Sequence, residues 1–256
     1  MLVNSDWKNT LNQMIDLNCD MGEGIGNDEA IMPYINSANI SCGFHAGNGH
    51  TIRRAIELAL KHKVRIGAHP SFRDKENFGR KEMHLPSEKL YAIVLEQLIK
   101  IDLIAKENSA TLHHVKPHGA LYNMAARDSQ IARTIAQAIK DFNDELVLYG
   151  LSNSVMISEA QAIGLKTGSE VFADRTYQDD GSLTPRSQSN ALIDDEEQSV
   201  RQVLQMINEG TVTTVTGMII PINADTICIH GDGKHAVRFA KKIRKALQEN
   251  HLAKTI

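Results

Sequence analysis

The sequence predicts a closed (β/α) barrel, an α/β fold in which parallel strands alternate with the helices that cover them. Short apolar runs alternate along the chain with longer stretches whose apolar residues recur every three or four positions. Polar side chains stand at the ends of nearly every apolar run. That spread favours convergence on the single mouth of a barrel over the one switch point of an open, doubly wound sheet. We expect residues 14–256 to form this single domain.

Seven strands are predicted where the apolar runs are short. They are Met14–Cys19, Ala38–Gly43, Val64–His69, Leu112–Lys116, Leu146–Gly150, Ser169–Ala173 and Thr226–His230. The region Thr211–Ile222 is expected to add a further strand or a small hairpin.

Four helices are predicted from apolar stripes at helical spacing. The stripes are Leu90, Val94, Leu98, Ile101 and Ala105; Ile131, Ile135, Ala138 and Phe142; Val200, Val203, Leu204 and Ile207; and Ala236, Ala240, Ile243 and Leu247. Ser87 and Asp128 are predicted N-caps, and Asp194 is expected to open an acidic first turn. The loop 177–190 is the longest polar connection, which we expect over a surface or an active site.

Composition excludes several classes of protein. The chain has 256 residues, 42% of them hydrophobic and 23% charged, and a net charge of −3 without a basic block. Nucleic-acid binders usually carry a basic face, and the longest apolar runs are only strand-length, so neither nucleic-acid binding nor a membrane span is expected. Residues 1–13 are polar, lack the apolar core of a signal peptide and are expected to be a disordered extension. The three cysteines form no C-x-x-C pair, which predicts buried free thiols and a cytoplasmic location.

The polar residues near the strand ends follow the two-residue period of a strand. In the first strand Asp16, Asn18 and Asp20 share one face, opposite the apolar positions. The same arrangement recurs in the later strands, and imidazoles follow the second and third strands. The repeated set comprises His45, His69, His114, Lys116, His118, Glu170, Asp174, Thr226, Cys228, His230 and Asp232.

These residues predict an active site when they are taken together. A single strand-end histidine is more often a hydrogen-bonded structural group than a catalyst. Burying acids, a lysine and several imidazoles around one centre, however, costs too much folding free energy unless these groups are paired or functional. The candidate catalytic residues are Asp16, Lys116, His118 and Asp174. The candidate substrate-binding residues are Asn18, His45, His69, Glu170, Arg175, His230 and Asp232.

Carboxylates and imidazoles of this kind supply general acids and bases. Lys116 could stabilise an oxyanion or bind an anionic substrate, whereas a Schiff-base role has no further support in the sequence. Arg175 and Arg80 could hold a carboxylate in a bidentate clamp, although Arg80 could equally be a surface residue.

The sequence contains no familiar cradle for a nucleotide. The stretch Gly22–Gly26 follows a strand but departs from G-x-G-x-x-G, and Glu23 within it would repel phosphate. The stretch Gly231–Lys234 lacks the upstream glycine of a P-loop. A divalent metal is chemically compatible with His45, His69, His118 and acidic neighbours, but no H-E-x-x-H spacing supports it and the ligand set stays open.

Six long stretches, in order along nearly the whole chain, resemble the LamB/YcsF family. They are Asp16–Gly24, Ser37–Gly47, Ile66–Pro70, Val115–Asn123, Glu170–Arg175 and Asp225–Asp232. The departures from the family pattern lie in loops, at Asn48-Gly49, Ser71–Asp74 and Gln188–Asn190, and they bear on specificity more than on the class of reaction.

The resemblance implies an irregular seven-stranded (β/α) barrel, TIM-like and similar to that of glycoside hydrolases and polysaccharide deacetylases. It also implies a hydrolase activity, the ATP-coupled opening of the 5-oxo-L-proline lactam to L-glutamate, carried out as the A subunit of a 5-oxoprolinase beside partner subunits B and C. Because this chain lacks a nucleotide cradle, we expect the partners to handle most of the ATP binding. Two alternatives remain: a stand-alone metal-dependent amidohydrolase or deacetylase, and a non-catalytic binding subunit.

Overall fold

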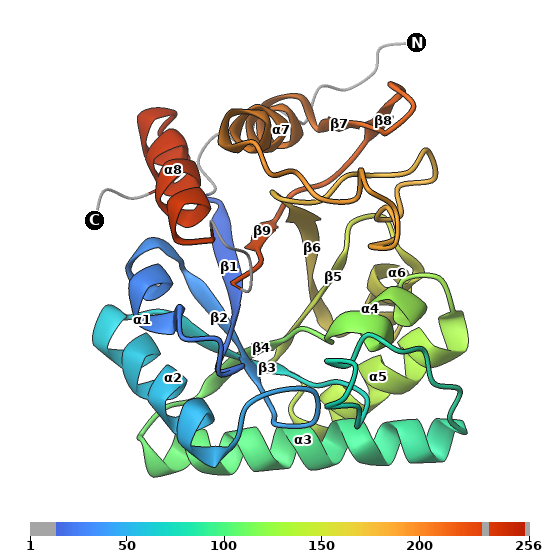
Figure 1. Ribbon diagram of the computed structural model, residues 1–256. Helices are drawn as coiled ribbons and strands as arrows, with labels where there is room; N and C mark the ends of the chain where they lie inside the picture. The colour runs from blue at the N-terminus through green and yellow to red at the C-terminus, as the bar shows by residue number, and fades with distance from the viewer. Residues whose placement is uncertain (1–13, 232–235, 254–256) are drawn as a thin grey trace.

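Seven parallel strands close into a barrel in the computed structural model, which describes residues 14–231 and 236–253 (Figure 1). The strands are β1 (Asp16–Met21), β2 (Ser37–Ser41), β3 (Arg65–His69), β4 (Leu112–Val115), β5 (Val147–Leu151), β6 (Lys166–Phe172) and β9 (Thr226–Ile229). Their order around the barrel is β1-β2-β3-β4-β5-β6-β9, and β9 pairs with β1 to close it. The predicted TIM-like α/β barrel and all seven predicted strands are confirmed.

A two-stranded antiparallel hairpin lies outside the barrel. It consists of β7 (Thr211–Thr213) and β8 (Ile219–Pro221), with the left-handed Gly217 (φ 89°) in the connection between them. The expected small hairpin in Thr211–Ile222 is therefore confirmed, and it contributes no barrel strand.

The helices form an outer ring, in which the long α3 packs on α5 and α7 packs on α8. Their bounds are α1 (Asp28–Ile31), the 3₁₀ helix η2 (Met32–Tyr34), α2 (Gly49–His62), α3 (Ser87–Glu107), α4 (Gly119–Ala125), α5 (Ser129–Phe142), α6 (Val155–Ala162), α7 (Glu196–Glu209) and α8 (Ala236–Glu249). The four predicted stripes fall on α3, α5, α7 and α8. The stripe on α3 is buried throughout, because that face covers the barrel.

The helix starts follow the local chemistry of the backbone. Asp128 caps α5 as predicted, accepting from the amides of Gln130 and Ile131. Two predicted starts are displaced by one residue. Ser87 is the first residue of α3, because Pro86 holds the extended cap position, and the cap of α7 is Asp195, one residue after the predicted Asp194.

The apolar core lies between the strands and the helices, whereas the inside of the barrel is polar. Leu17 and Cys19 of β1 are fully buried on the outer face. Asp16, Asn18 and Asp20 bond across the barrel, so the predicted alternation is confirmed. TIM barrels usually fill this space with branched apolar side chains, so the polar filling is a departure that calls for a chemical explanation.

The three cysteines are buried free thiols, as predicted. Within the described ranges, no helix combines the length and apolar character needed to cross a bilayer. The expected disordered extension, residues 1–13, lies outside the described residues.

Candidate active site

Asp16 lies at the amino end of β1, on the opposite side of the barrel from the predicted mouth. Its carboxylate accepts from Ser37 Oγ (2.8 Å), Arg65 Nη2 (2.6 Å), Tyr149 OH (3.1 Å) and Thr226 Oγ1 (2.6 Å). Parity assigned Asp16 correctly to the inner face, but four residues of strand separate it from Asp20, a distance of roughly 13 Å. The expectation that Asp16 meets the other acids is corrected: its bonds tie the closed end of the barrel together.

The middle of the barrel is a buried hydrogen-bond layer centred on Asn18 and Asn39. Asn18 Nδ2 donates to Glu170 Oε1 (2.9 Å), and Asn39 Nδ2 donates to Asn18 Oδ1 (2.8 Å). His114 Nε2 lies 2.8 Å from Asn39 Oδ1, and its ring crosses Gly67 so closely that a Cβ there would meet Nε2 at 2.1 Å. Asn18, expected to bind substrate, therefore lies beneath the site and positions Glu170.

Lys116 occupies the centre of the carboxyl end and is buried, with 3% of its surface exposed. Its Nζ lies 3.0 Å from Asp20 Oδ1, 3.0 Å from Glu170 Oε1 and 3.0 Å from Cys228 Sγ. Burial alone would lower the pKa of Lys116, but the charges of Asp20 and Glu170 outweigh it and raise the pKa well above the ordinary value. The side chain is thus a fixed ammonium ion, which disfavours a Schiff-base role because that chemistry needs the free amine.

Three imidazoles and a carboxylate gather beside Lys116. His45, from the segment after β2, stacks on His118 with ring centres 3.8 Å apart. His69, at the end of β3, places Nε2 2.9 Å from His118 Nδ1 and 3.3 Å from Asp20 Oδ2. Glu23 Oε1 lies 3.2 Å from His45 Nε2 and 3.8 Å from His118 Nδ1. One donor atom from each of these four residues lies within 4.8 Å of the others, so the cluster could hold a metal ion.

The segment after β3 fixes two of these rings. Phe78 has a left-handed backbone (φ 56°), and its carbonyl oxygen accepts from His118 Nε2 (2.9 Å). At the neighbouring Gly79, a Cβ would stand 2.8 Å from His45 Cβ and 2.9 Å from His118 Cδ2. A bulky residue with positive φ is strained, so surrounding contacts must hold this conformation, and such strain concentrates at functional sites.

Asp174 and His230 form a second pair at the rim. His230 Nδ1 lies 2.9 Å and 3.0 Å from the two carboxylate oxygens, and the His230 amide also donates to Asp174. Burial would raise the pKa of Asp174, but the charge of His230 and its hydrogen bonds lower it below the usual range. Both side chains keep a small exposed fraction, 16% and 15%, so water reaches the pair.

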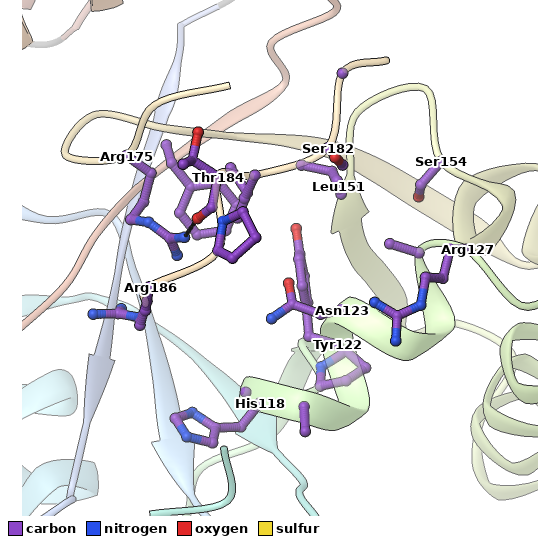
Figure 2. A pocket seen from close by; sticks show the side chains of 18 of the residues that line it. His118, Tyr122, Asn123, Arg127, Leu151, Ser154, Arg175, Ser182, Thr184 and Arg186 are labelled. Carbon is purple, nitrogen blue, oxygen red and sulfur yellow. Dashed lines mark hydrogen bonds between the residues drawn. The ribbon is translucent and has the colours of Figure 1, made fainter. Parts of the chain in front are cut away.

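A cavity of about 770 Å³ opens above these groups at the carboxyl ends of the strands. Asp20, His69, Lys116, His118 and His230 line its inner part. Figure 2 shows Tyr122 and Asn123 of α4 on one side of the cavity and Arg175, Thr184 and Ser182 on the other. The loop 177–190 therefore lies over the candidate active site, one of the two positions expected for it.

Arg175 lines this cavity but has a second task. Its Nε donates to the carbonyl of Ala191 (3.2 Å) and its Nη2 to that of Thr184 (2.5 Å), so the guanidinium holds the loop in place. Because Nε and Nη2 are occupied by these backbone carbonyls, the guanidinium has few free donors for the bidentate carboxylate clamp that the sequence suggested. Arg80 and Arg186, both exposed, also line the cavity.

The structure thus brings together His45, His69, Lys116, His118 and Glu170, with Asp174 and His230 at the rim. Asp232 lies outside the described residues. Asp20 and Glu23 are central to the geometry, although neither was among the candidate site residues: the sequence placed Asp20 on one face of the first strand and treated Glu23 as an acid that would repel phosphate. The parity of β1, which turns Asp20 inward at the carboxyl end, was the signal for Asp20; nothing local indicated the contact between Glu23 and His45.

A closed parallel barrel with an ionisable cluster at the carboxyl ends of its strands is the arrangement of TIM-like enzymes. The sequence profile of the LamB/YcsF family matches residues 15–255. The chain belongs to the LamB/YcsF family.

Its relatives cover almost the whole chain. A protein of Brevibacillus brevis, named as the A subunit of 5-oxoprolinase, is 53% identical over 238 residues, which is 91% of this chain and 94% of that protein. A protein of the same name from Bordetella parapertussis is 50% identical over 248 residues, covering 95% of this chain and 98% of the relative.

Solved structures agree with the fold. The crystal structure of a lactam utilization protein from Thermus thermophilus superposes with a TM-score of 0.87 at 42% identity, covering 93% of this chain and 98% of that one. A putative cellobiose-phosphate cleavage protein from Enterococcus faecalis, at 12% identity and a TM-score of 0.59, covers 95% of this chain and 97% of its own and shares the fold alone.

Proposed function

We propose that this chain is the A subunit of an ATP-dependent 5-oxoprolinase, which opens the lactam of 5-oxo-L-proline to L-glutamate. The observation that carries the proposal is the buried ammonium of Lys116 at the floor of the cavity, in a chain whose full-length relatives bear that name. A lactam carbonyl develops negative charge on its oxygen when it is attacked, and a fixed cation in a shielded site stabilises that charge.

Coupling to ATP answers a chemical difficulty. A five-membered lactam is a resonance-stabilised amide with little ring strain, so its carbon is a poor electrophile. Transfer of the γ-phosphoryl group to the lactam oxygen activates that carbon and releases ADP. Water then adds, the C–N bond breaks with protonation of the nitrogen, and a second water releases phosphate from the resulting acyl phosphate to leave glutamate.

The residues of this chain divide the work by position. Lys116 faces the lactam or phosphoryl oxygen, held by Asp20 and Glu170. His230, oriented by Asp174, moves the proton between water and the leaving nitrogen, because this pair keeps contact with solvent. Asp16, predicted as a carboxylate catalyst, has no part in this proposal, because it lies at the opposite end of the barrel.

The imidazoles His69 and His118 form the cavity wall beside Lys116, and His45 stacks on His118. His118 was predicted as the acid–base partner, but its ring nitrogens already contact His69 and the Phe78 carbonyl. We therefore give His118 a positioning role. Arg175 acts through the loop that it holds over the substrate.

We propose that the partner subunits B and C supply most of the ATP site. Neither Gly22–Gly26 nor Gly231–Lys234 has the spacing of a phosphate cradle, and Glu23 turns toward imidazoles.

The test is an assay of 5-oxoproline consumption and glutamate formation by the purified chain, alone and with subunits B and C, with and without ATP. We expect turnover only in the complete, ATP-supplied mixture. In that mixture, Lys116→Met should lower kcat by about 10²–10³-fold, the usual loss for one oxyanion-stabilising group. Asp174→Asn should lower kcat by about 10²–10⁴-fold, the range for a general acid–base pair.

The matched control is Lys89→Met, an exposed lysine on α3, which should leave turnover unchanged. Circular dichroism of each variant separates loss of chemistry from loss of fold. Consumption by this chain alone without ATP would instead support an independent amidohydrolase. Wild-type turnover in both Lys116→Met and Asp174→Asn, with weakened assembly, would support a binding subunit.

A further inference from the structure

The imidazole cluster beside Lys116 contains two contacts in which, when the rings are neutral and the outer nitrogens carry the protons, both atoms are acceptors. The first joins His69 Nε2 and His118 Nδ1 at 2.9 Å, and the second joins His45 Nε2 and Glu23 Oε1 at 3.2 Å. Both contacts lie in a site that is almost closed to water. Two lone pairs facing each other at hydrogen-bond distance repel unless something positive lies between them.

The tautomers follow from the far side of each ring. His69 Nδ1 donates to the backbone carbonyl of Lys116 (2.6 Å), and His118 Nε2 donates to that of Phe78 (2.9 Å). A carbonyl oxygen only accepts, so each of these nitrogens carries the proton of its neutral ring. The two nitrogens that face each other are therefore both lone pairs.

His45 follows the same pattern. Its Nδ1 lies 2.9 Å from Ser71 Oγ, whose own hydroxyl donates to the carbonyl of Phe72 (2.9 Å). With its proton on the Phe72 carbonyl, Ser71 accepts from Nδ1–H, and His45 Nε2 then presents a lone pair to the carboxylate of Glu23. All three rings turn a lone pair inward while the outer nitrogen is anchored, which is the outer-shell pattern of metal-ligating histidines.

We propose that Glu23, His45, His69 and His118 form a binding site for one divalent transition-metal ion, with Zn²⁺ as the best-fitting ion. Such a site goes beyond the proposed function and does not depend on it.

The spacing fits one ion. Metal–ligand bonds of about 2.1 Å in a tetrahedron put neighbouring donor atoms about 3.4 Å apart. The observed separations of 2.9, 3.2 and 3.8 Å scatter around that value, and no two of the donor atoms lie more than 4.8 Å apart. Imidazole donors favour zinc and its neighbours over Mg²⁺ and Ca²⁺, which prefer oxygen.

Added protons would explain the two short contacts less simply than one bound metal ion. Without an ion the two contacts need two extra protons in a buried site: one on His69 Nε2, which also lies 3.3 Å from Asp20 Oδ2, and one shared between His45 and Glu23, whereas a single cation satisfies both contacts. The neighbouring group Asp20, Cys228 and His230 also has metal-ligand chemistry, but the Lys116 ammonium already lies against Asp20 and Cys228.

The ion would be accessible from the cavity, because His69 and His118 line its wall whereas Glu23 and His45 lie behind them.

The test is metal binding by the full chain, without substrate, ATP or partner subunits. The protein is stripped with a chelator, titrated with ZnCl₂ by calorimetry and analysed for zinc after gel filtration. We expect one equivalent in the wild type. His118→Ala and Glu23→Gln should weaken the affinity at least about 10–100-fold, and His84→Ala, an exposed histidine outside the cluster, should bind as the wild type does.

A measurement on the wild type removes any dependence on how the variants fold. Long-range ¹H–¹⁵N spectra of the imidazoles should show protons on His69 Nδ1 and His118 Nε2, and Zn²⁺ should shift the opposite nitrogens. Binding near zero in the wild type, binding unchanged in both ligand variants, or unshifted His69 and His118 signals at saturating Zn²⁺ would each overturn the proposal. Each of these outcomes leaves the 5-oxoprolinase assay unaffected as a separate question.

Discussion

Adding one methyl group at Gly67 should break the polar layer in the middle of the barrel. A Cβ at this position would lie 2.1 Å from His114 Nε2 and 2.3 Å from its Cδ2, so the ring must move. Moving it breaks the 2.8 Å contact with Asn39 and the stacking on Tyr149, whose ring centre is 4.2 Å away.

The size of the effect follows from two costs. Overpacking a closed interior costs about 1–3 kcal/mol. Leaving the buried oxygen of Asn39 without its partner costs about 1–3 kcal/mol more. We therefore expect Gly67→Ala to lower the free energy of unfolding by about 4 kcal/mol, which corresponds to a fall in Tm of roughly 8–16 °C for a chain of this size.

Differential scanning calorimetry measures this, with Gly49→Ala as the control. Gly49 begins α2, and nothing lies within 4 Å of the Cβ that alanine would add, so its Tm should stay unchanged or rise slightly. In a His114→Ala background the clash is gone, and Gly67→Ala should cost little. If the double variant lost as much stability as Gly67→Ala and His114→Ala together, the clash with the His114 ring would not explain the cost of Gly67→Ala. That result would refute the predicted clash.

Three further predictions concern stability and reactivity. Asp16→Asn should lower the free energy of unfolding by about 3 kcal/mol, because the charged acceptor of four donors is lost. The control, Asp144→Asn at an exposed position, should leave the Tm unchanged. Calorimetry compares the two variants, and equal Tm values would contradict the structural role of Asp16. The pKa of Asp174, which faces His230 and Arg186, is lowered in the fold, so the ionised carboxylate stabilises the protein above the unfolded pKa of about 4. This stabilisation is lost as the pH falls through the folded pKa, so the difference in Tm between wild type and Asp174→Asn should close below that pH. A series of melts at different pH values measures this, and a constant difference in Tm would exclude the linkage. All three thiols should resist a water-soluble disulfide reagent in the native protein and react after denaturation. Burial closes access to the thiols and raises the pKa of Cys42 to about 12. Rapid labelling of the native protein would show that the barrel opens.

The sequence predicted the barrel well because its signals were local and periodic. Every barrel strand was found from a short apolar run, and the inner face of β1 from the alternation of Asp16, Asn18 and Asp20. The displaced start at Ser87 reflects the proline before it, which takes the cap position itself.

Depth along the barrel axis could not be predicted in the same way. Parity gives the face of a residue but not its level, so Asp16 was grouped with residues at the far end of the interior. The contacts of Glu23 with His45 and of Arg175 with its own loop join segments whose approach depends on how the loops fold. No pattern in the sequence encodes that approach.

Because β6 pairs directly with β9, residues 173–225 leave the barrel and return to it without contributing a barrel strand. This excursion carries the roof of the cavity, α7 and the hairpin, and it is tied to β6 where the buried Tyr177 hydroxyl accepts from the Phe172 amide (2.8 Å). The rest of the roof supplies no barrel strand, so exchanging residues 178–190 between two relatives, with Tyr177 kept, should leave the scaffold intact and would test whether the roof sets ligand preference.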